Sequence, residues 1–477
     1  MRAHLPRRRA ERRGLRLWPV GAVLVLAFAT AIIVAATVFY TGWDLLGARG
    51  LKPEHRIDST TLFDLVKLSF GVVAGAGALV ALVVAYRRQR VDEDGALREA
   101  TRLHTERFTT AVSQLGDESA AVCLGGVHAL AGLADDAPTR DLRQTCIDVL
   151  CAYLQLPFTP DPGTDPAHQE EHHRYLAFRK VRHTILRLIG DHYRRPWGTH
   201  RSWQGCDLDL TGVTIDSDMD FQGAKFSGGS VSFRDATFSS NKWNFRDATF
   251  SSGSVSFYGA KFSGSDMEFQ GAKFSGGSVS FRDATFSSGS VSFFRGKFSG
   301  SDMDFQGATF SGGSVSFRDA TFRRGEVSFG GATFSGGSVS FGDATFSGSN
   351  VTFNDATFSG GEVSFGASFS SGHVTLVNAR FSGADVSLIN ATFSGGDVFF
   401  NHATFSGGEV FFINATFSAG SVSFGDATFS GGEVSFVNAT FSGGEVSFSG
   451  ATGEAPSGLV PSGSPPVGLI LPPAWSS

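Results

Sequence analysis

The stretch from Val231 to Ser254 reads VSFRDATFSSNKWNFRDATFSSGS, and its pattern continues through most of the second half of the chain. Two five-residue units, such as Val231-Ser-Phe-Arg-Asp and Ala236-Thr-Phe-Ser-Ser, are followed by a two-residue spacer. Phe-to-Phe spacings of five and seven therefore alternate, with one slip at Gly366. A fixed 12-residue period predicts a repeat architecture rather than a string of ordinary domains.

Each unit also alternates in polarity, which is the pattern of a short strand with one apolar face. Val231 and Phe233, for example, alternate with Ser232 and Arg234. The Ser-Gly-Gly-Ser runs between units predict corners, because glycine adopts positive φ readily. Strands this short need coils stacked at about 4.8 Å above and below them. Seven of the 47 Phe precede Phe221, so 40 lie in the repeat, and each contributes about 1.5–3 kcal/mol when buried. The sequence predicts a parallel β-solenoid over residues 206–450.

The five-residue units resemble those of pentapeptide-repeat proteins, which have a small residue, a polar residue, a central Leu or Phe and two outward residues. Cys206-Asp-Leu-Asp-Leu and Thr211-Gly-Val-Thr-Ile fit that unit without any spacer. The resemblance covers about half of the chain and implies a right-handed, four-sided β-helix. The chain departs from the family pattern in its two-residue spacer after every second unit. The whole chain, with two apolar segments and a helical region before the repeats, resembles pentapeptide-repeat membrane proteins of actinobacterial type.

The length of one coil is open, since a coil could consist of one 12-residue repeat or of two. Asp266-Met-Glu-Phe-Gln-Gly-Ala recurs almost unchanged from Asp302, three repeats further on, which favours the single repeat as the duplicated unit. Ile389, Ile413 and Val437, each followed by Asn, recur at every second repeat, and other residues take their place in the repeats between. This spacing favours a 24-residue coil, with sides of five, seven, five and seven and a length of roughly 48 Å for ten coils. A flat coil made of a single repeat is the alternative.

Two apolar segments near the N-terminus predict a membrane hairpin. Residues 17–40 carry no charge, and this segment is longer than the about 20 residues that a helix needs to cross a bilayer. Residues 62–86 form the second segment, which is uncharged from Leu68 to Tyr86. We expect both to be transmembrane helices of an integral, two-span protein.

Basic residues predict the orientation of this hairpin in a cell membrane. Seven Arg lie within residues 1–16, and Arg87, Arg88 and Arg90 follow the second span. Residues 41–61 hold three basic and three acidic residues. The positive-inside rule places residues 1–16, both termini and the solenoid in the cytoplasm, and residues 41–61 on the outside.

Residues 91–195 read as a cytoplasmic helical region. A helix start is expected at Asp136-Ala137-Pro138, and residues 119–154 resemble one HEAT-type helical hairpin. Cys123, Cys146, Cys151 and Cys206 fit no zinc or redox spacing and are expected to be buried, reduced thiols. His168-Gln-Glu-Glu-His172 fits the H-x-x-E-H zinc motif, but no protease-sized domain surrounds it. Residues 451–477, rich in Pro, Ser and Gly, are expected to be disordered.

The repeat contains no catalytic constellation, so we expect no enzymatic activity, no cofactor and no metal. The predicted function is a membrane-anchored scaffold that binds a protein of unknown identity. The alternative use of the same surface is self-association into a homo-oligomer. The candidate interaction patch consists of Ile389, Ile413, Val437, Phe399 and Phe411.

The alternative function is mimicry of DNA towards a topoisomerase. It draws on ten acids and one base, Arg380, between Glu326 and Glu445. Nine net charges over this stretch are sparse beside one charge per about 1.7 Å of duplex. Nucleic acid itself is not an expected partner.

Overall fold

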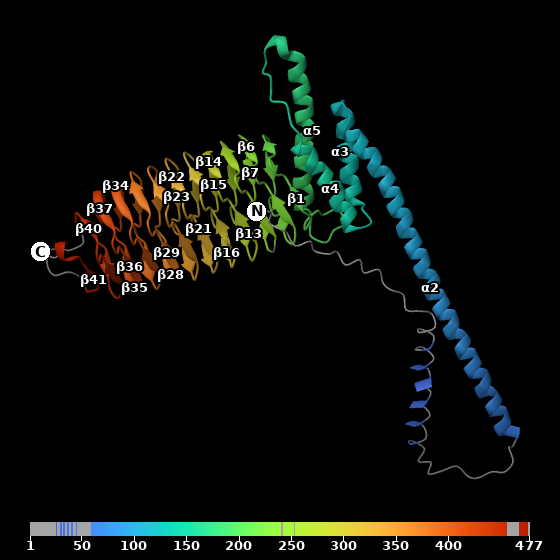
Figure 1. Ribbon diagram of the computed structural model, residues 1–477. Helices are drawn as coiled ribbons and strands as arrows, with labels where there is room; N and C mark the ends of the chain where they lie inside the picture. The colour runs from blue at the N-terminus through green and yellow to red at the C-terminus, as the bar shows by residue number, and fades with distance from the viewer. Residues whose placement is uncertain are drawn as a thin grey trace, which may run out of the picture. The chain divides into compact units, whose positions relative to one another are not determined.

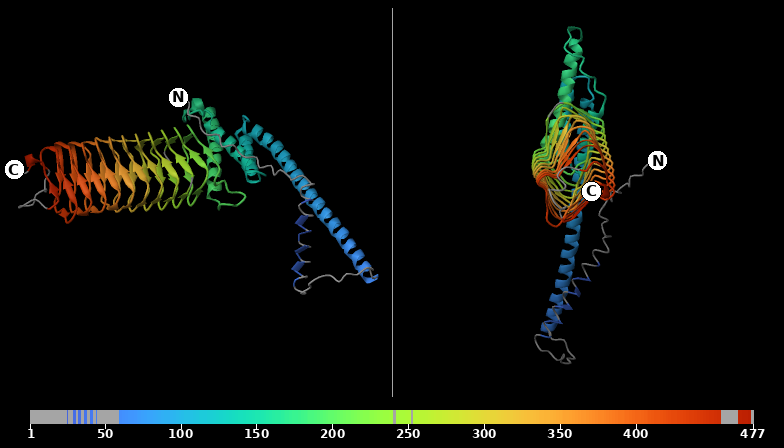
Figure 2. Two further views of the ribbon diagram at one scale, coloured as in Figure 1. Left: turned by 60° about the horizontal axis from the view of Figure 1, so that its bottom comes forward. Right: turned by 90° about the vertical axis from the view of Figure 1, so that its left-hand side faces the viewer.

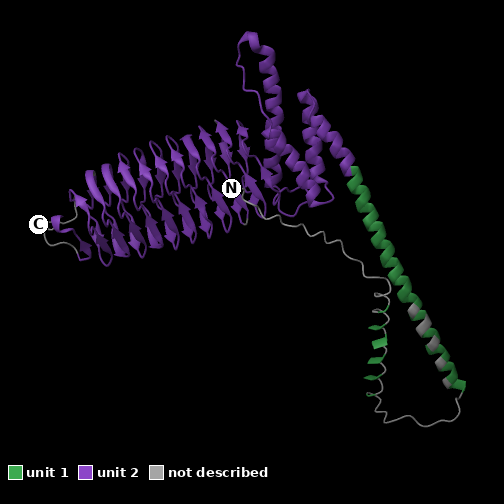
Figure 3. Ribbon diagram, viewed as in Figure 1, with its two compact units in different colours: residues 1–103 green, residues 104–477 purple. Residues whose placement is uncertain are grey.

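The computed structural model describes residues 59–239, 242–251, 253–455 and 467–475, with ten separate helical positions between Val25 and Asp44. Figure 1 shows the chain, and Figure 2 gives two further views. The chain divides into two compact units, residues 1–103 and residues 104–477 (Figure 3). The second unit holds all of the described strands.

A single helix, α2 (Ser59–Leu115), begins in the first unit and contains the whole of the second apolar segment. The sequence led us to expect separate helices before and after residue 90. The helix continues because only Gly95 disfavours it there, at a cost of about 1 kcal/mol. Most of the first apolar segment, residues 17–40, and most of residues 41–61 lie outside the described residues. In the part of the chain that is described, no helix has both the length and the apolar character needed to cross a membrane.

Three shorter helices follow in the second unit: α3 (Ala120–Asp135), α4 (Arg140–Gln155) and α5 (Gln169–Arg194), the last preceded by the 3₁₀ turn η1 (Pro166–His168). Thr139 caps α4, since its hydroxyl accepts the Leu142 amide at 3.3 Å. The expected α3–α4 hairpin is therefore present. Leu130, Ile147 and Ile185 join the three helices in one buried cluster.

The solenoid has four sides, and its first coil shows each of them once. Sides 1 to 4 begin with β1 (Leu208–Asp209), β2 (Thr214–Ile215), β3 (Met219–Asp220) and β4 (Lys225–Phe226). The chain then returns to side 1 as β5 (Ser230–Ser232), which pairs in parallel with β1. Side 1 forms a 12-stranded sheet, sides 2 and 3 a 19-stranded sheet, and side 4 a sheet of ten strands, one per coil.

Strand pairing fixes the length of the coil. Val255 pairs with Val231 and with Val279, so equivalent residues on neighbouring coils are 24 apart in sequence. The 24-residue coil is confirmed, and the 12-residue coil is wrong. Viewed end-on, the coils superimpose in one closed outline (Figure 2). The right-handed winding that the family resemblance implies stays a prediction.

Tight turns form the corner between sides 1 and 2 and the corner between sides 3 and 4. In one of them, the Ala236 amide donates to the Phe233 carbonyl at 3.2 Å, and Asp235 has a φ of 55°. A positive φ at the third residue defines this turn and favours Gly, Asn or Asp. The Ser-Gly-Gly-Ser runs predict only the other two corners. The Asp or Asn that precedes Ala in so many units is the sequence signal for these turns.

The slip at Gly366 removes one residue from one of these turns. There the Ala367 amide donates to the Phe365 carbonyl at 2.6 Å, so the turn is one residue shorter. Pairing across this point shortens by one position, as in Phe346 with Phe369, and the ordinary spacing returns where Phe369 pairs with Phe393. The irregularity is therefore absorbed within one coil.

Stacks of phenylalanine fill the interior. Phe412 and Phe436, one coil apart, have ring centroids 4.6 Å apart and planes within 1° of parallel. Because ring spacing equals coil spacing, a buried Phe contacts the equivalent rings on the neighbouring coils. The solenoid is thus held together by nearest-neighbour contacts between coils.

Helices cover the N-terminal edge of the solenoid, where α4 contacts β1 and α5 contacts β3. Asp216, in the first coil, binds α5 through two contacts: Oδ1 lies 2.8 Å from His183 Nε2, and Oδ2 lies 2.6 Å from Arg179 Nε. The hydrogen bond from His183, followed by that from Arg179, lowers the pKa of Asp216 to about 2 despite partial burial. A covered edge is protected from pairing with a strand of another chain.

The C-terminal edge is covered by part of the tail, contrary to the expectation of disorder over residues 451–477. β41 (Leu469–Ile470) pairs with β39 (Glu445–Ser447) and extends side 1. The Trp475 ring lies 5.4 Å from the Phe448 ring, and its Nε1 donates to the Gly453 carbonyl at 2.9 Å. Composition predicts disorder because it does not reveal that Trp475 packs against Phe448, at the C-terminal end of a Phe stack. Residues 456–466 lie outside the described residues.

Candidate functional site

Outward side chains form columns along the solenoid. Since strand pairing joins residues 24 apart, equivalent residues on successive coils lie about 4.8 Å apart. A surface site is therefore built from residues that recur every 24 positions, with the shorter step at Gly366 taken into account.

Ile389, Ile413 and Val437 form one column at the corner between sides 3 and 4. The Asn390 amide donates to the Ile413 carbonyl, and the Asn414 amide donates to the Val437 carbonyl, both at 3.0 Å. The two Ile side chains are half-buried, and Val437 is 45% exposed. Asn414 Nδ2 also donates to Asn390 Oδ1 at 3.4 Å. The predicted apolar column and its neighbouring Asn ladder are both present.

The two outward phenylalanines of the predicted patch lie on different sides. Phe411 ends β34 (Thr404–Phe411) on side 3, two residues before Ile413. Phe399 ends β33 (Asp397–Phe399) on side 1, where its ring lies 5.9 Å from His373. The two residues are half a coil apart in sequence, so they cannot share a side. The structure brings four of the five predicted residues together and leaves Phe399 apart.

A column of carboxylates runs along side 3 at the end opposite the apolar column, with one column of three Ser and Phe411 between the two. Its residues lie on β27 (Glu362–Ser364), β31 (Asp385–Ser387), β34 and β37 (Thr428–Ser435). Glu362 pairs with Asp385, and Glu409 pairs with Glu433. Asp385 Oδ1 accepts the Glu409 amide at 3.0 Å, which joins the two pairs. The excess of acidic residues is evident from the sequence, but only the coil spacing assigns these four to one side.

We call this combined surface the side-3 face. Its residues are Glu362, Asp385, Ile389, Glu409, Phe411, Ile413, Glu433 and Val437.

Earlier coils carry the opposite charge on side 4. Lys273 pairs directly with Lys297. Arg323 ends β20 (Thr321–Arg323) on the next coil and pairs with Ser299. The basic residues therefore lie on side 4 of the earlier coils and the carboxylate column on side 3 of the later coils, and each favours association with an oppositely charged surface.

The H-x-x-E-H motif does not assemble a metal centre among the described residues. His168 ends η1, and His172 lies in α5 with its Nδ1 2.7 Å from Asp161 Oδ1. Within the described ranges, no group of three or more His, Cys, Asp and Glu side chains is arranged to hold a metal ion.

The four cysteines are buried and form no disulfide, as the sequence predicts. Burial raises the pKa of Cys146 to about 11 and that of Cys151 to about 12. A thiol is nucleophilic only as the thiolate. These groups are therefore structural side chains of the helical region.

No protein-family model matches this sequence, and neither a curated protein nor a solved structure is significantly similar to it. The shape and chemistry of the solenoid surface therefore carry the functional argument.

Proposed function

We propose that this protein is a membrane-anchored, non-enzymatic β-solenoid that binds a partner protein on the side-3 face. The observation that carries the proposal is the apolar column at Ile389, Ile413 and Val437, which borders the same side of the solenoid as a column of four carboxylates. An outward apolar surface with a charged border is typical of protein interfaces. The regular solenoid holds the carboxylates on four successive coils and the apolar side chains on the last three of them.

The chemistry of the face defines its partner. Stacked carboxylates about 4.8 Å apart repel one another, and a cationic partner relieves that repulsion. Burial of the partner's aliphatic or aromatic side chains against the apolar column is favourable, because apolar surface is removed from water. The partner segment therefore carries Lys or Arg on one edge and apolar side chains on the other. A second copy of this chain, with basic residues such as Lys273 and Lys297, meets part of that description.

Site-specific photo-crosslinking in the native cell tests this proposal. A photoreactive phenylalanine analogue replaces Val437 in one protein and Val377 in its control. Val377 is also outward and half-buried, and it lies in the turn between sides 1 and 2. We expect a discrete adduct from position 437 alone.

Two sets of substitutions separate the apolar and charged contributions, with the photoreactive analogue now at Phe411. Changing Ile389, Ile413 and Val437 together to Ser should abolish the adduct. Changing Glu409 and Glu433 to Gln should weaken it and reduce its sensitivity to salt. An unchanged set of adducts in the triple Ser variant would refute the proposal.

Membrane anchorage through residues 17–40 and 62–86 is the second part of the proposal. It is supported by two long uncharged segments and by the distribution of Arg around them. In α2, apolar side chains of the second segment are exposed, among them Phe70 at 72% and Leu82 at 69%. A helix with such a surface needs an apolar environment around it.

Cysteine labelling in intact cells tests both anchorage and orientation. The native thiols are buried, so an added cysteine dominates the signal. We expect Ala48→Cys to react with a membrane-impermeant maleimide in intact cells, and Ser476→Cys to react only after permeabilisation. Labelling of Ser476→Cys in intact cells would overturn the cytoplasmic placement, and recovery of the chain in the soluble fraction would overturn anchorage.

DNA mimicry is the weaker candidate, because the acidic column offers one carboxylate per coil of about 4.8 Å. Duplex DNA carries one charge per about 1.7 Å of its axis. The apolar column has no counterpart on a duplex surface. Inhibition of gyrase supercoiling by the full-length protein at stoichiometric concentrations would favour mimicry over the scaffold.

A further inference from the structure

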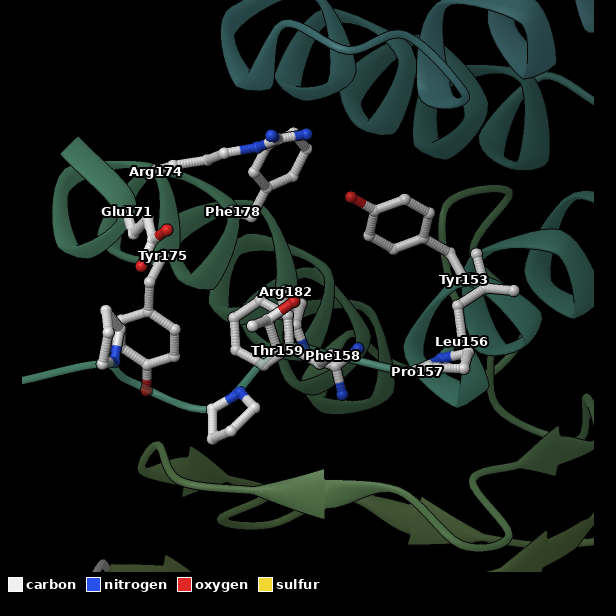
Figure 4. A pocket seen from close by; sticks show the side chains of 12 residues that line it. Tyr153, Leu156, Pro157, Phe158, Thr159, Glu171, Arg174, Tyr175, Phe178 and Arg182 are labelled. Carbon is white, nitrogen blue, oxygen red and sulfur yellow. The ribbon is translucent and has the colours of Figure 1, made fainter. Parts of the chain in front are cut away.

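A pocket of about 570 Å³ lies in the helical region. Its walls come from α5, from Tyr153 near the end of α4 and from the segment that follows α4, and Figure 4 shows these side chains around one space. Four of the twelve lining residues are aromatic, and two are arginines. The six residues that carry the argument are Tyr153, Phe158, Arg174, Tyr175, Phe178 and Arg182. This volume is in the range of sites for small molecules.

Arg182 is the unusual member of this lining, because it is only 8% exposed. Its guanidinium lies 4.9 Å from the centre of the Phe158 ring. Within the described residues, no carboxylate or carbonyl forms a hydrogen bond or ion pair with it. The nearby carboxylate of Asp216 uses both oxygens on Arg179 and His183. A buried guanidinium normally has an anionic partner, since burial of an unpaired charge is costly.

The rest of the pocket limits what that partner can be. Phe158 and Tyr175 pack with ring centroids 5.2 Å apart and form an aromatic wall. At the exposed rim, Arg174 lies over Phe178, and Glu171 provides the opposite charge. Since Arg174 and Glu171 cancel, Arg182 alone determines the net charge of the lining. The pocket therefore suits a single negative charge attached to a flat apolar body.

Several features restrain the segment that borders the pocket. Pro157, Pro160 and Pro162 restrict its backbone, and Asp161 ties it to α5 through the 2.7 Å contact with His172. The Gly163 amide also donates to Asp161 Oδ1 at 2.9 Å. The pocket is thus pre-formed, which reduces the entropic cost of binding.

We infer that this pocket binds a small monocarboxylate with an aromatic body, whose carboxylate pairs with the buried Arg182 guanidinium. Arginine presents two parallel N–H groups that match the two oxygens of a carboxylate. The aromatic body packs against Phe158, Tyr175 and Phe178. This inference does not depend on the side-3 face or on the partner proposed for it.

Isothermal titration calorimetry on the full-length protein in detergent tests the inference with 2-naphthoate as the probe. The amide 2-naphthamide has nearly the same shape without the charge, and acetate has the charge without the rings. We expect 2-naphthoate to bind, and both comparators to bind at least tenfold more weakly. No binding of 2-naphthoate up to its solubility limit, or equal binding of the amide, would overturn the inference.

Arg182→Met and Arg187→Met are matched variants, since both exchange an arginine of α5 for an apolar side chain of similar length, and Arg187 is exposed and does not line the pocket. We expect Arg182→Met to weaken 2-naphthoate binding at least tenfold and Arg187→Met to change it less than threefold. Without ligand, Arg182→Met should melt at the same temperature as the wild type or higher, because it removes an unpaired buried charge. A lower melting temperature would assign Arg182 a structural role and overturn the inference, as would unchanged binding.

Discussion

Replacement of Asp216 by Asn should loosen the helical cap from the first coil. The pKa of this carboxyl falls from its ordinary 3.8 to about 2, first through the hydrogen bond from His183 and then through that from Arg179. At 1.36 kcal/mol per pKa unit, this corresponds to about 2 kcal/mol in favour of the ionised, folded state. Because the side chain is 29% exposed, solvent screening removes only part of that energy.

The sign of the pH dependence follows from the direction of the change. The pKa is lower in the folded state than in the unfolded state, so the stabilisation is complete above pH 4 or so. It is lost as the pH falls towards 2. Asp216→Asn should lack this contribution at every pH.

Hydrogen–deuterium exchange of the full-length chain measures the loss of stability at the contact between α5 and the first coil. Opening of a solenoid edge is local, so peptides from α5 and the first coil report it best. About 2 kcal/mol corresponds to a roughly 30-fold loss of protection at pH 7. Asp247→Asn is the control, since Asp247 is an exposed turn residue whose equivalents Asn390, Asn414 and Asn438 carry the substituted side chain. Equal protection in Asp216→Asn and the wild type would refute this account, as would an unchanged pH profile.

Three further predictions concern a corner of the solenoid, the four buried thiols and the C-terminal edge. Gly289→Ala should destabilise by about 1–3 kcal/mol in denaturant, because its φ is +89° and a Cβ would collide with the Ser265 carbonyl oxygen; Gly342→Ala, with its nearest neighbouring atom at 3.6 Å, should be nearly neutral. Ellman's reagent at pH 8 should label none of the four thiols in the native protein and all four in guanidinium, since burial raises the pKa of each; rapid native labelling would contradict this. Trp475→Ala should cost about 1–2 kcal/mol and speed amide exchange in residues 440–453, whereas unchanged exchange there would show that the tail does not cover the last coil.

The repeat made the solenoid predictable because every level of its pattern agrees. Alternation defined the strands, glycine and serine marked two of the corners, and the 24-residue recurrence of Ile389, Ile413 and Val437 favoured the 24-residue coil that strand pairing then confirmed. The turn residues such as Asp235 were overlooked because their positive φ becomes evident only when the strands on both sides are paired.

Other features depend on contacts between distant residues, which periodicity does not encode. Trp475 covers the last Phe stack although its neighbours in sequence are Pro, Ala and Ser. Phe399 was grouped with Phe411 by chemistry alone, without regard to the half-coil between them. Arg182 was overlooked because it is one of several basic residues in α5, and only the packed structure shows that it is buried while Arg174 is exposed.

The mismatch between a 12-residue repeat and a 24-residue coil has a consequence for how such a chain changes over evolutionary time. Gain or loss of a single repeat upstream of Ile389 would leave every Phe stack in register, because half a coil exchanges one Phe-bearing strand for another. The apolar column would nevertheless move to the corner between sides 1 and 2, and the carboxylates would leave side 3. Recombination between repeats can thus rotate a binding surface by half a turn about an unaltered core, whereas gain or loss of two repeats changes only the reach of the solenoid.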